Sequence, residues 1–137
     1  MRLAVVCAMA LVLSSCAAAE GDDISTTAAF PEDTVDCPVI EAVDLKQTAP
    51  GVFTANTTVR SVDIEGVSYA DAWEIRDLSG EVLGERVLTH PHANEQPFTR
   101  SLSGIAISPD ITSVEVAARD SVRGFCGPTL IVEVTHS

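Results

Sequence analysis

The chain has 137 residues, of which 46% are apolar and 4% aromatic, and its 20 acidic residues against 8 Lys and Arg give a formal net charge of −12. This length fits one domain of ordinary size and leaves no room for a second full one. The negative charge and the lack of a Lys/Arg-rich run exclude nucleic acid as a partner, because an anionic polymer would be repelled over most of the surface.

The first fifteen residues have the pattern of a secretory signal peptide. Met1-Arg2 supply a positive charge, residues 3–13 are all apolar, and the small residues Ser14-Ser15 then lead to Cys16. The apolar run is shorter than the about 20 residues that a membrane-spanning helix needs, and no later stretch reaches that length. The sequence therefore predicts export, without a transmembrane helix.

The residues Leu13-Ser14-Ser15-Cys16 resemble the lipobox of bacterial lipoproteins, in which a branched apolar residue and two small residues precede a cysteine. The resemblance implies cleavage before Cys16, diacylation of its thiol, and a protein anchored on the extracytoplasmic face of the cell membrane. Two or three acyl chains anchor a protein stably in a bilayer, whereas a protein with a single chain dissociates from it, because each buried methylene contributes about 0.8 kcal/mol. The alternative is an ordinary signal peptide cut nearer residues 17–19, with Cys16 a spare thiol.

Residues 17–34 are predicted to be a flexible linker. They contain five acidic residues, no basic residue and little apolar periodicity, so they cannot offset the entropy of ordering the chain. The predicted organisation is a signal peptide at residues 1–15, a lipidated Cys16 with its acidic linker at 16–34, and one domain at 35–137.

Two cysteines remain for the domain, because Cys7 lies in the signal peptide and Cys16 is the proposed lipid site. We expect Cys37 and Cys126 to form a disulfide in an oxidising envelope, tying the start of the domain to its last loop. A lone reactive thiol at Cys126 is the alternative, but it lacks the second cysteine of a C-x-x-C redox motif.

The domain sequence alternates apolar and polar residues over short stretches, which is typical of strands with one buried face. Trp73 and Ile75 show this period, so Trp73 is expected in the core, whereas Tyr69 and Phe125 are expected to be partly exposed. A short helical turn is an option between Gly104 and Asp110. The predicted strands are residues 39–45, 52–59, 62–66, 72–77, 81–88, 97–102, 113–119 and 129–136, with a hairpin over 72–88. Seven or eight short strands predict an all-β, two-sheet β-sandwich.

Residues 72–83 and 113–120 resemble the immunoglobulin-like domain of bacterial spore-germination proteins and envelope lipoproteins. In that family a strand with a central aromatic residue leads through D-x-x-G-x-V-L into the next strand, as Trp73 and residues 77–83 do here. The resemblance covers about residues 50–135 and implies an immunoglobulin-like β-sandwich that acts as a binding or structural module, with no catalytic residues to carry over. Cys37 lies too far before Trp73 for the disulfide of antibody-type domains.

The segment Thr89-His90-Pro91-His92-Ala93-Asn94-Glu95 has the most distinctive chemistry. His90 and His92 point the same way in an extended chain, and Glu95 or His136 would complete a zinc or copper site. Structural metal sites usually need four ligands, so a polar loop without a cofactor is the favoured interpretation.

No catalytic motif is present: the sequence lacks G-x-S-x-G, H-E-x-x-H, G-x-G-x-x-G and the phosphate-binding G-x-x-x-x-G-K-[ST]. The sequence therefore predicts a non-enzymatic, membrane-anchored envelope lipoprotein that contacts an envelope protein or polymer. The alternatives are a metal-binding lipoprotein using the loop of His90 and His92, and a hydrolase or enzyme inhibitor of unrecognised type.

Overall fold

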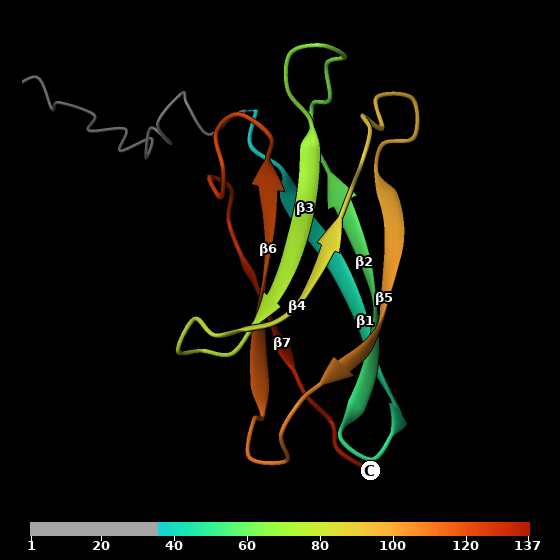
Figure 1. Cartoon of the computed structure of the whole chain (residues 1–137), viewed down its shortest axis with the longest axis vertical. Coiled ribbons are helices and arrows are strands. Elements are labelled where there is room, and N and C mark those ends of the chain that lie inside the picture. The colour runs from blue at the N-terminus through green and yellow to red at the C-terminus, as the bar shows by residue number, and fades with distance from the viewer. Residues whose placement is uncertain (1–35) are drawn as a thin grey trace, which may run out of the picture.

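The computed structural model describes residues 36–137, which form an all-β sandwich of seven strands in two antiparallel sheets (Figure 1). The predicted β-sandwich is therefore confirmed, whereas the signal peptide, Cys16 and the linker at 17–34 lie outside the described residues. The strands are β1 (Val39–Ala49), β2 (Val52–Arg60), β3 (Ala70–Arg76), β4 (Val82–Val87), β5 (Phe98–Ala106), β6 (Ser113–Asp120) and β7 (Leu130–Glu133).

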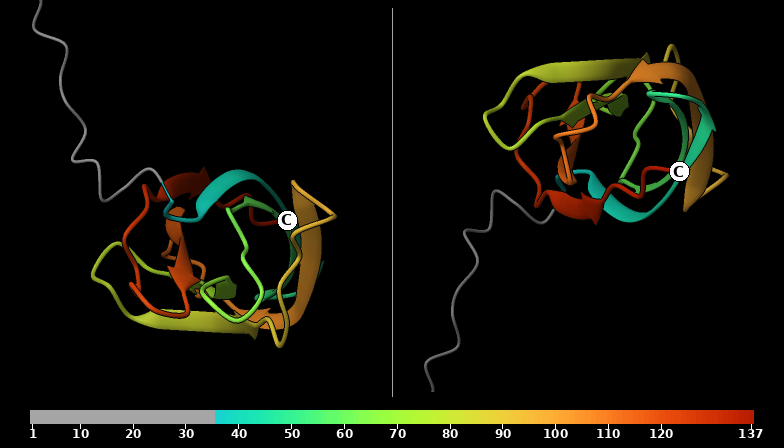
Figure 2. Two further views of the ribbon diagram at one scale, coloured as in Figure 1. Left: turned by 90° about the horizontal axis from the view of Figure 1, so that it is seen from above. Right: turned by 90° about the horizontal axis from the view of Figure 1, so that it is seen from below.

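One sheet has the strand order β1-β2-β5 and the other has the order β4-β3-β6-β7. The chain passes between the sheets after β2, after β4 and after β5, and the two sheets face each other across a common interior (Figure 2). The predicted hairpin is present as β3 and β4, whose last pair joins Arg76 to Val82.

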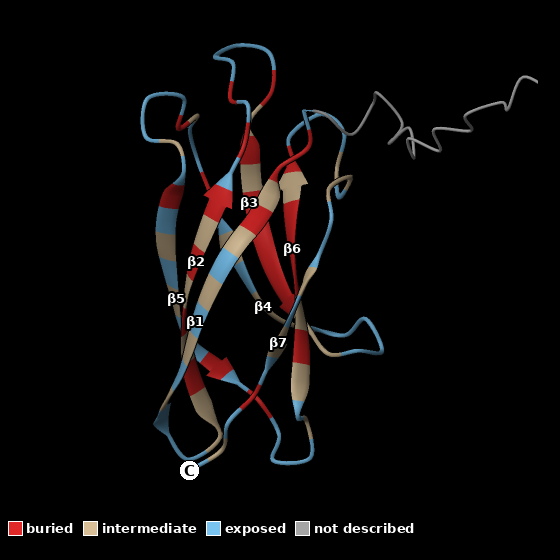
Figure 3. Cartoon of the chain, turned by 180° about the vertical axis from the view of Figure 1, so that it is seen from behind, coloured by how far each residue is buried: buried red, intermediate tan, exposed pale blue. Residues whose placement is uncertain are grey.

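The core lies between the sheets and is built from the inward-facing residues of each strand (Figure 3). Trp73 is completely buried, as expected from its alternation with Ile75, while Tyr69 is half-buried and Phe125 is 42% exposed. Because the apolar side chains of both sheets meet here, burial of this surface is the main stabilising term of the domain. The largest fully buried side chains include Trp73, Phe53, Ile75, Ile105, Ile107, Val59, Val114 and Val116.

One predicted strand is wrong, and the optional helical turn does not become a helix. Residues 62–66 do not form a strand: Ile64 pairs only with Ser68 in an isolated bridge, around a tight turn in which the N–H of Val67 donates to the carbonyl of Ile64 (3.0 Å). Gly66 has a φ of 75°, which favours glycine at this turn. Between Gly104 and Asp110, β5 continues to Ala106, where it pairs with the start of β2, and a single turn follows, in which the N–H of Ile111 donates to the carbonyl of Ser108 (3.0 Å).

The predicted disulfide joins Cys37, just before β1, to Cys126 in the loop between β6 and β7, across a sequence separation of 89. It fastens the start of the domain to its last loop, and both cysteines lie outside the strands. The backbone is packed closely beside it, because a Cβ atom on Gly127 would lie 2.0 Å from the carbonyl oxygen of Pro38. A side chain at position 127 would therefore push the two segments apart.

Three loops gather where the described chain begins at residue 36 (Figure 1). They are the β2–β3 loop (residues 61–69), the β4–β5 loop (88–97) and the β6–β7 loop (121–129), and together with residues 36–38 we call them the loop end. The β1–β2 turn, the β5–β6 loop and Ser137 lie at the opposite end, and the β3–β4 turn projects sideways from the half of the molecule nearer that end. No helix that could cross a membrane occurs between residues 36 and 137.

Candidate functional site

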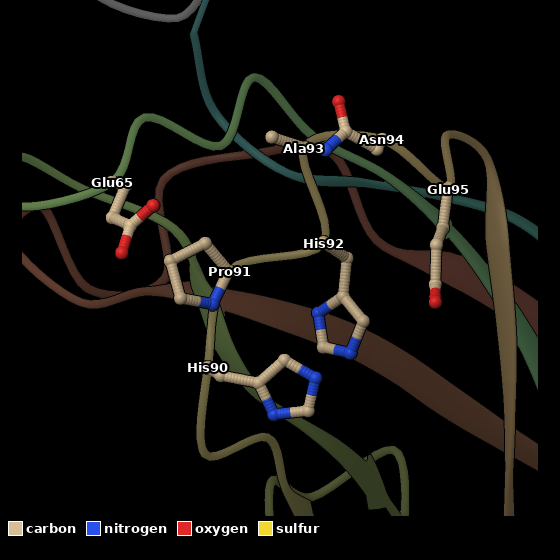
Figure 4. A pocket seen from close by; sticks show the side chains of 7 residues that line it. All are labelled: Glu65, His90, Pro91, His92, Ala93, Asn94 and Glu95. Atoms are coloured by element: carbon tan, nitrogen blue, oxygen red, sulfur yellow. The ribbon is translucent and has the colours of Figure 1, made fainter.

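The loop end contains a hollow of about 330 Å³ that includes the segment with His90 and His92. It is lined by Glu65 of the β2–β3 loop and by residues 90–95 of the β4–β5 loop. Figure 4 shows the two imidazole rings side by side, with Glu65 and Glu95 on either side of them in this view. The groups that line it are mainly imidazoles, carboxylates and an amide, so the hollow is suited to polar ligands.

A buried carboxylate holds the β4–β5 loop in place. The Asp63 side chain is completely buried, and its two oxygens accept hydrogen bonds from the backbone N–H groups of Ala70 (3.0 Å) and His92 (2.7 Å). Hydrogen bonds to an ionised carboxylate are about twice as strong as neutral ones. Asp63 therefore fixes the start of β3 and the centre of the histidine loop relative to each other.

Gln96 makes a second connection between the same two loops. Its Oε1 accepts from the backbone N–H of Ser61 (2.9 Å), and its Nε2 donates to the carbonyl of His92 and to Oγ of Ser61, both at 3.2 Å. At the end of the loop, Glu95 forms an ion pair with Arg100 (2.7 Å). These contacts hold the loop in place through the protein's own side chains, which lowers the entropy cost of binding a ligand there.

The His92 ring is a packed side chain with one unused polar atom. It is 3% exposed and stacks on Phe98, with the ring centroids 4.1 Å apart and the planes 15° from parallel. Its Nδ1 has no hydrogen-bond partner among residues 36–137 and lies 3.9 Å from the Asp63 carboxylate. Burial lowers the pKa of His92, Arg100 and His90 lower it further, and Asp63 and Glu95 oppose them. The neutral imidazole is therefore more strongly favoured in the folded protein than in a free histidine side chain.

The other proposed metal ligands do not come together. His90 is exposed and its ring lies 4.6 Å from that of His92, but His136 lies at the opposite end, where it packs against Phe53 and its Nε2 donates to the carbonyl of Ile111 (2.8 Å). The idea that His136 completes a metal site is therefore wrong. Residues 36–137 contain no group of three or more His, Cys, Asp or Glu placed to hold an ion.

We expect zinc and copper titrated into the protein to give no stoichiometric binding. Two imidazoles supply only half of the ligands of a structural metal site. Glu95 is paired with Arg100, and this ion pair competes with the use of Glu95 as a third metal ligand. Isothermal titration calorimetry measures this directly. One equivalent of metal bound by the wild type and lost in a His90→Ala variant would contradict the expectation.

A second cluster, which the sequence did not indicate, lies on the outer face of the four-stranded sheet. The guanidinium of Arg76 lies 4.2 Å from the centre of the Phe125 ring and donates a hydrogen bond to the Glu74 carboxylate (2.8 Å). Arg119 donates a hydrogen bond to the Asp71 carboxylate (2.8 Å). The Asp71 carboxylate raises the pKa of Arg119. The charges are paired within the cluster, so its main effect is to hold the exposed Phe125 ring against the sheet.

Comparison with known proteins gives one informative similarity. The chain is 33% identical over 118 residues to a protein of Halomicrobium mukohataei named "Putative lipoprotein". The aligned region covers 84% of this chain and 58% of that protein, so the chain spans less than two thirds of the length of this relative. No protein-family model matches the chain, and no solved structure matches it. The resemblance to the immunoglobulin-like spore-germination domain therefore rests on the sequence motif alone.

Proposed function

We propose that the protein is a lipid-anchored envelope lipoprotein whose β-sandwich serves as a non-catalytic binding or structural module. The observation that carries this proposal is the similarity, over 84% of the chain, to a protein with lipoprotein in its name. The motif Leu13-Ser14-Ser15-Cys16 supports it independently and supplies the chemistry, because a thiol at Cys16 is the group to be acylated. Two or more acyl chains would then provide the stable membrane attachment.

The disulfide supports placement on the extracytoplasmic side of the membrane. Bonds such as Cys37–Cys126 form and persist in oxidising compartments, whereas reducing cytosol keeps thiols free in most organisms. The same bond ties residue 37 to the loop end, so a lipid on Cys16 would attach the domain to the membrane from that end. The acidic residues 17–34 would form the tether between the two.

The sandwich is suited to contacts with an envelope protein or polymer. Its β4–β5 loop is held by hydrogen bonds to Asp63 and Gln96, and the hollow beside it exposes His90, Glu65 and Glu95. Such groups recognise partners through hydrogen bonds and charge, without a cofactor. The proposed role therefore needs no reaction chemistry from this chain.

We expect a Cys16→Ala variant to lose all incorporation of a clickable fatty-acid analogue when it is expressed in cells. The acyl chains are carried by the Cys16 thiol, so no other residue replaces it. A Cys7→Ala variant is the matched control, because position 7 lies in the proposed signal peptide and should leave labelling unchanged. Equal labelling of the Cys16→Ala variant and the wild type would contradict the proposal.

A further inference from the structure

Exposed large apolar side chains are concentrated at the loop end. Five of the nine such side chains among the described residues lie there: Val62, Ile64, Val67, Val122 and Phe125. Leu78 lies in the β3–β4 turn, and the other three are on β4 and β7. Phe125 is held against the sheet by Arg76, which leaves the exposed side chains of Val62, Ile64, Val67 and Val122, a set that we call the apolar tip. Exposed apolar side chains that gather at one end of a domain are a candidate contact surface.

The backbone holds the apolar tip outward. In the β2–β3 loop, the N–H of Ile64 donates to the carbonyl of Ser68 (2.8 Å) and the N–H of Val67 donates back to Ile64 (3.0 Å). The loop is tied to the neighbouring β6–β7 loop, because the N–H of Tyr69 donates to Oγ of Ser121 and the N–H of Ser121 donates to the carbonyl of Tyr69. The hydrogen-bonded turn therefore displays apolar side chains that a freely collapsing loop would bury.

Three ion pairs lie near the apolar tip. Arg123 lies 3.5 Å from Asp36, Arg100 pairs with Glu95, and Arg60 pairs with Glu41. The carboxylates of Asp63 and Asp120 are buried and accept backbone N–H groups. Glu65 is left as the exposed carboxylate of this end without an ion pair among residues 36–137. These three carboxylates leave this end with an excess of negative charge, so its docking onto a surface would depend on the apolar side chains.

Three carboxylates without an ion-pair partner lie toward the opposite end. Asp77, Glu81 and Asp110 lie around adjacent hollows there, and none has a Lys or Arg partner within the described part of the chain. The excess of negative charge is therefore the same toward both ends, and charge does not set the orientation of the domain. The proposed lipid site at Cys16 precedes residue 36, which lies at the loop end, so the anchor favours an orientation with that end toward the lipid.

From this arrangement we infer that the apolar tip docks onto the lipid surface that holds the acyl chains of Cys16, so that the opposite end faces away from the membrane. The inference rests on the proposed lipid anchor. The anchor keeps the domain within one tether length of the bilayer, and this high effective concentration makes even weak insertion of four aliphatic side chains favourable. Aliphatic side chains on rigid loops are suited to the boundary between headgroups and acyl chains.

Nitroxide labelling of the full chain in membrane vesicles from the expressing cells tests the inference. Val67→Cys places the label on the apolar tip, and Leu78→Cys is the matched control in the β3–β4 turn, away from the loop end, since the two positions are 64% and 66% exposed. The introduced thiol is the reactive one, because Cys37 and Cys126 form a disulfide and Cys16 is acylated under the proposed function. Collision rates with oxygen, which concentrates in lipid, and with a water-soluble nickel complex are then measured by electron paramagnetic resonance.

We expect the ratio of oxygen to nickel collisions to be several-fold higher at position 67 than at position 78. Equal, water-like ratios in protein that sediments with the vesicles would overturn lipid docking and leave the anchor intact. A label at position 67 that is shielded from both reagents would also overturn it, because the apolar tip would then be covered by another protein. Failure of the protein to sediment with the vesicles would overturn the anchor and the docking together.

Discussion

Replacing both Cys37 and Cys126 by serine is expected to lower the free energy of unfolding of the sandwich by about 4 to 5 kcal/mol. The bond spans a sequence separation of 89. In the chain-entropy model, a cross-link over a loop of this length lowers the entropy of the unfolded chain and so raises its free energy by about this amount. Most domains have a free energy of unfolding of about 5 to 15 kcal/mol, so the loss would be a large part of the total. Urea unfolding of the double variant and the wild type measures the difference.

The double variant is the appropriate comparison, because a single substitution would also leave a free thiol. Wild-type protein unfolded in the presence of a reductant is the control and should approach the stability of the double variant. A change of less than about 1 kcal/mol in both experiments would show that the bond does not constrain the unfolded chain as the model requires.

Asp63→Asn is expected to destabilise the domain by about 2 to 4 kcal/mol. The buried carboxylate accepts the N–H groups of Ala70 and His92, one on each oxygen. An asparagine side chain has one acceptor oxygen, so its NH₂ group would face one of these two donors, leaving a buried N–H without a partner. Urea unfolding measures the loss of stability, and amide hydrogen exchange at positions 70 and 92 shows whether it arises at these bonds.

Asp44→Asn is the matched control for this change. The Asp44 side chain is 52% exposed on β1, where it pairs with Lys46. A pair in that position contributes at most about 1 kcal/mol, so the control variant should remain close to the wild type. If Asp63→Asn were no more destabilising than Asp44→Asn, with unchanged exchange at Ala70 and His92, the structural role given to Asp63 would be wrong.

The strands could be predicted where apolar residues alternate toward a shared core. Trp73 and Ile75 show this, because both lie on the inner face of β3. Val62 and Ile64 have the same spacing but are 50% and 49% exposed. Period-two spacing shows that two side chains lie on one side of an extended segment, but it does not show whether that side faces a core. Residues 62–66 were therefore predicted as a strand that the structure does not contain.

The candidate site could be predicted only as far as local sequence allows. His90 and His92 are two residues apart, so their proximity follows from the chain itself. Asp63 is separated from His92 by 29 residues, and Ser61 from Gln96 by 35. These contacts depend on how the β2–β3 and β4–β5 loops meet at one end of the sandwich. The chain topology that brings them together also carries His136 to the other end.

Intact-mass spectrometry of the mature protein, purified from the membranes of cells that express the full chain, tests the lipid anchor most directly. We predict a polypeptide that begins at Cys16, contains the Cys37–Cys126 disulfide and is heavier than its amino-acid sequence by the mass of two or three acyl chains. Fragmentation should place this added mass on the first residue. A mature protein of unmodified mass, or one that begins after Cys16, would contradict the account.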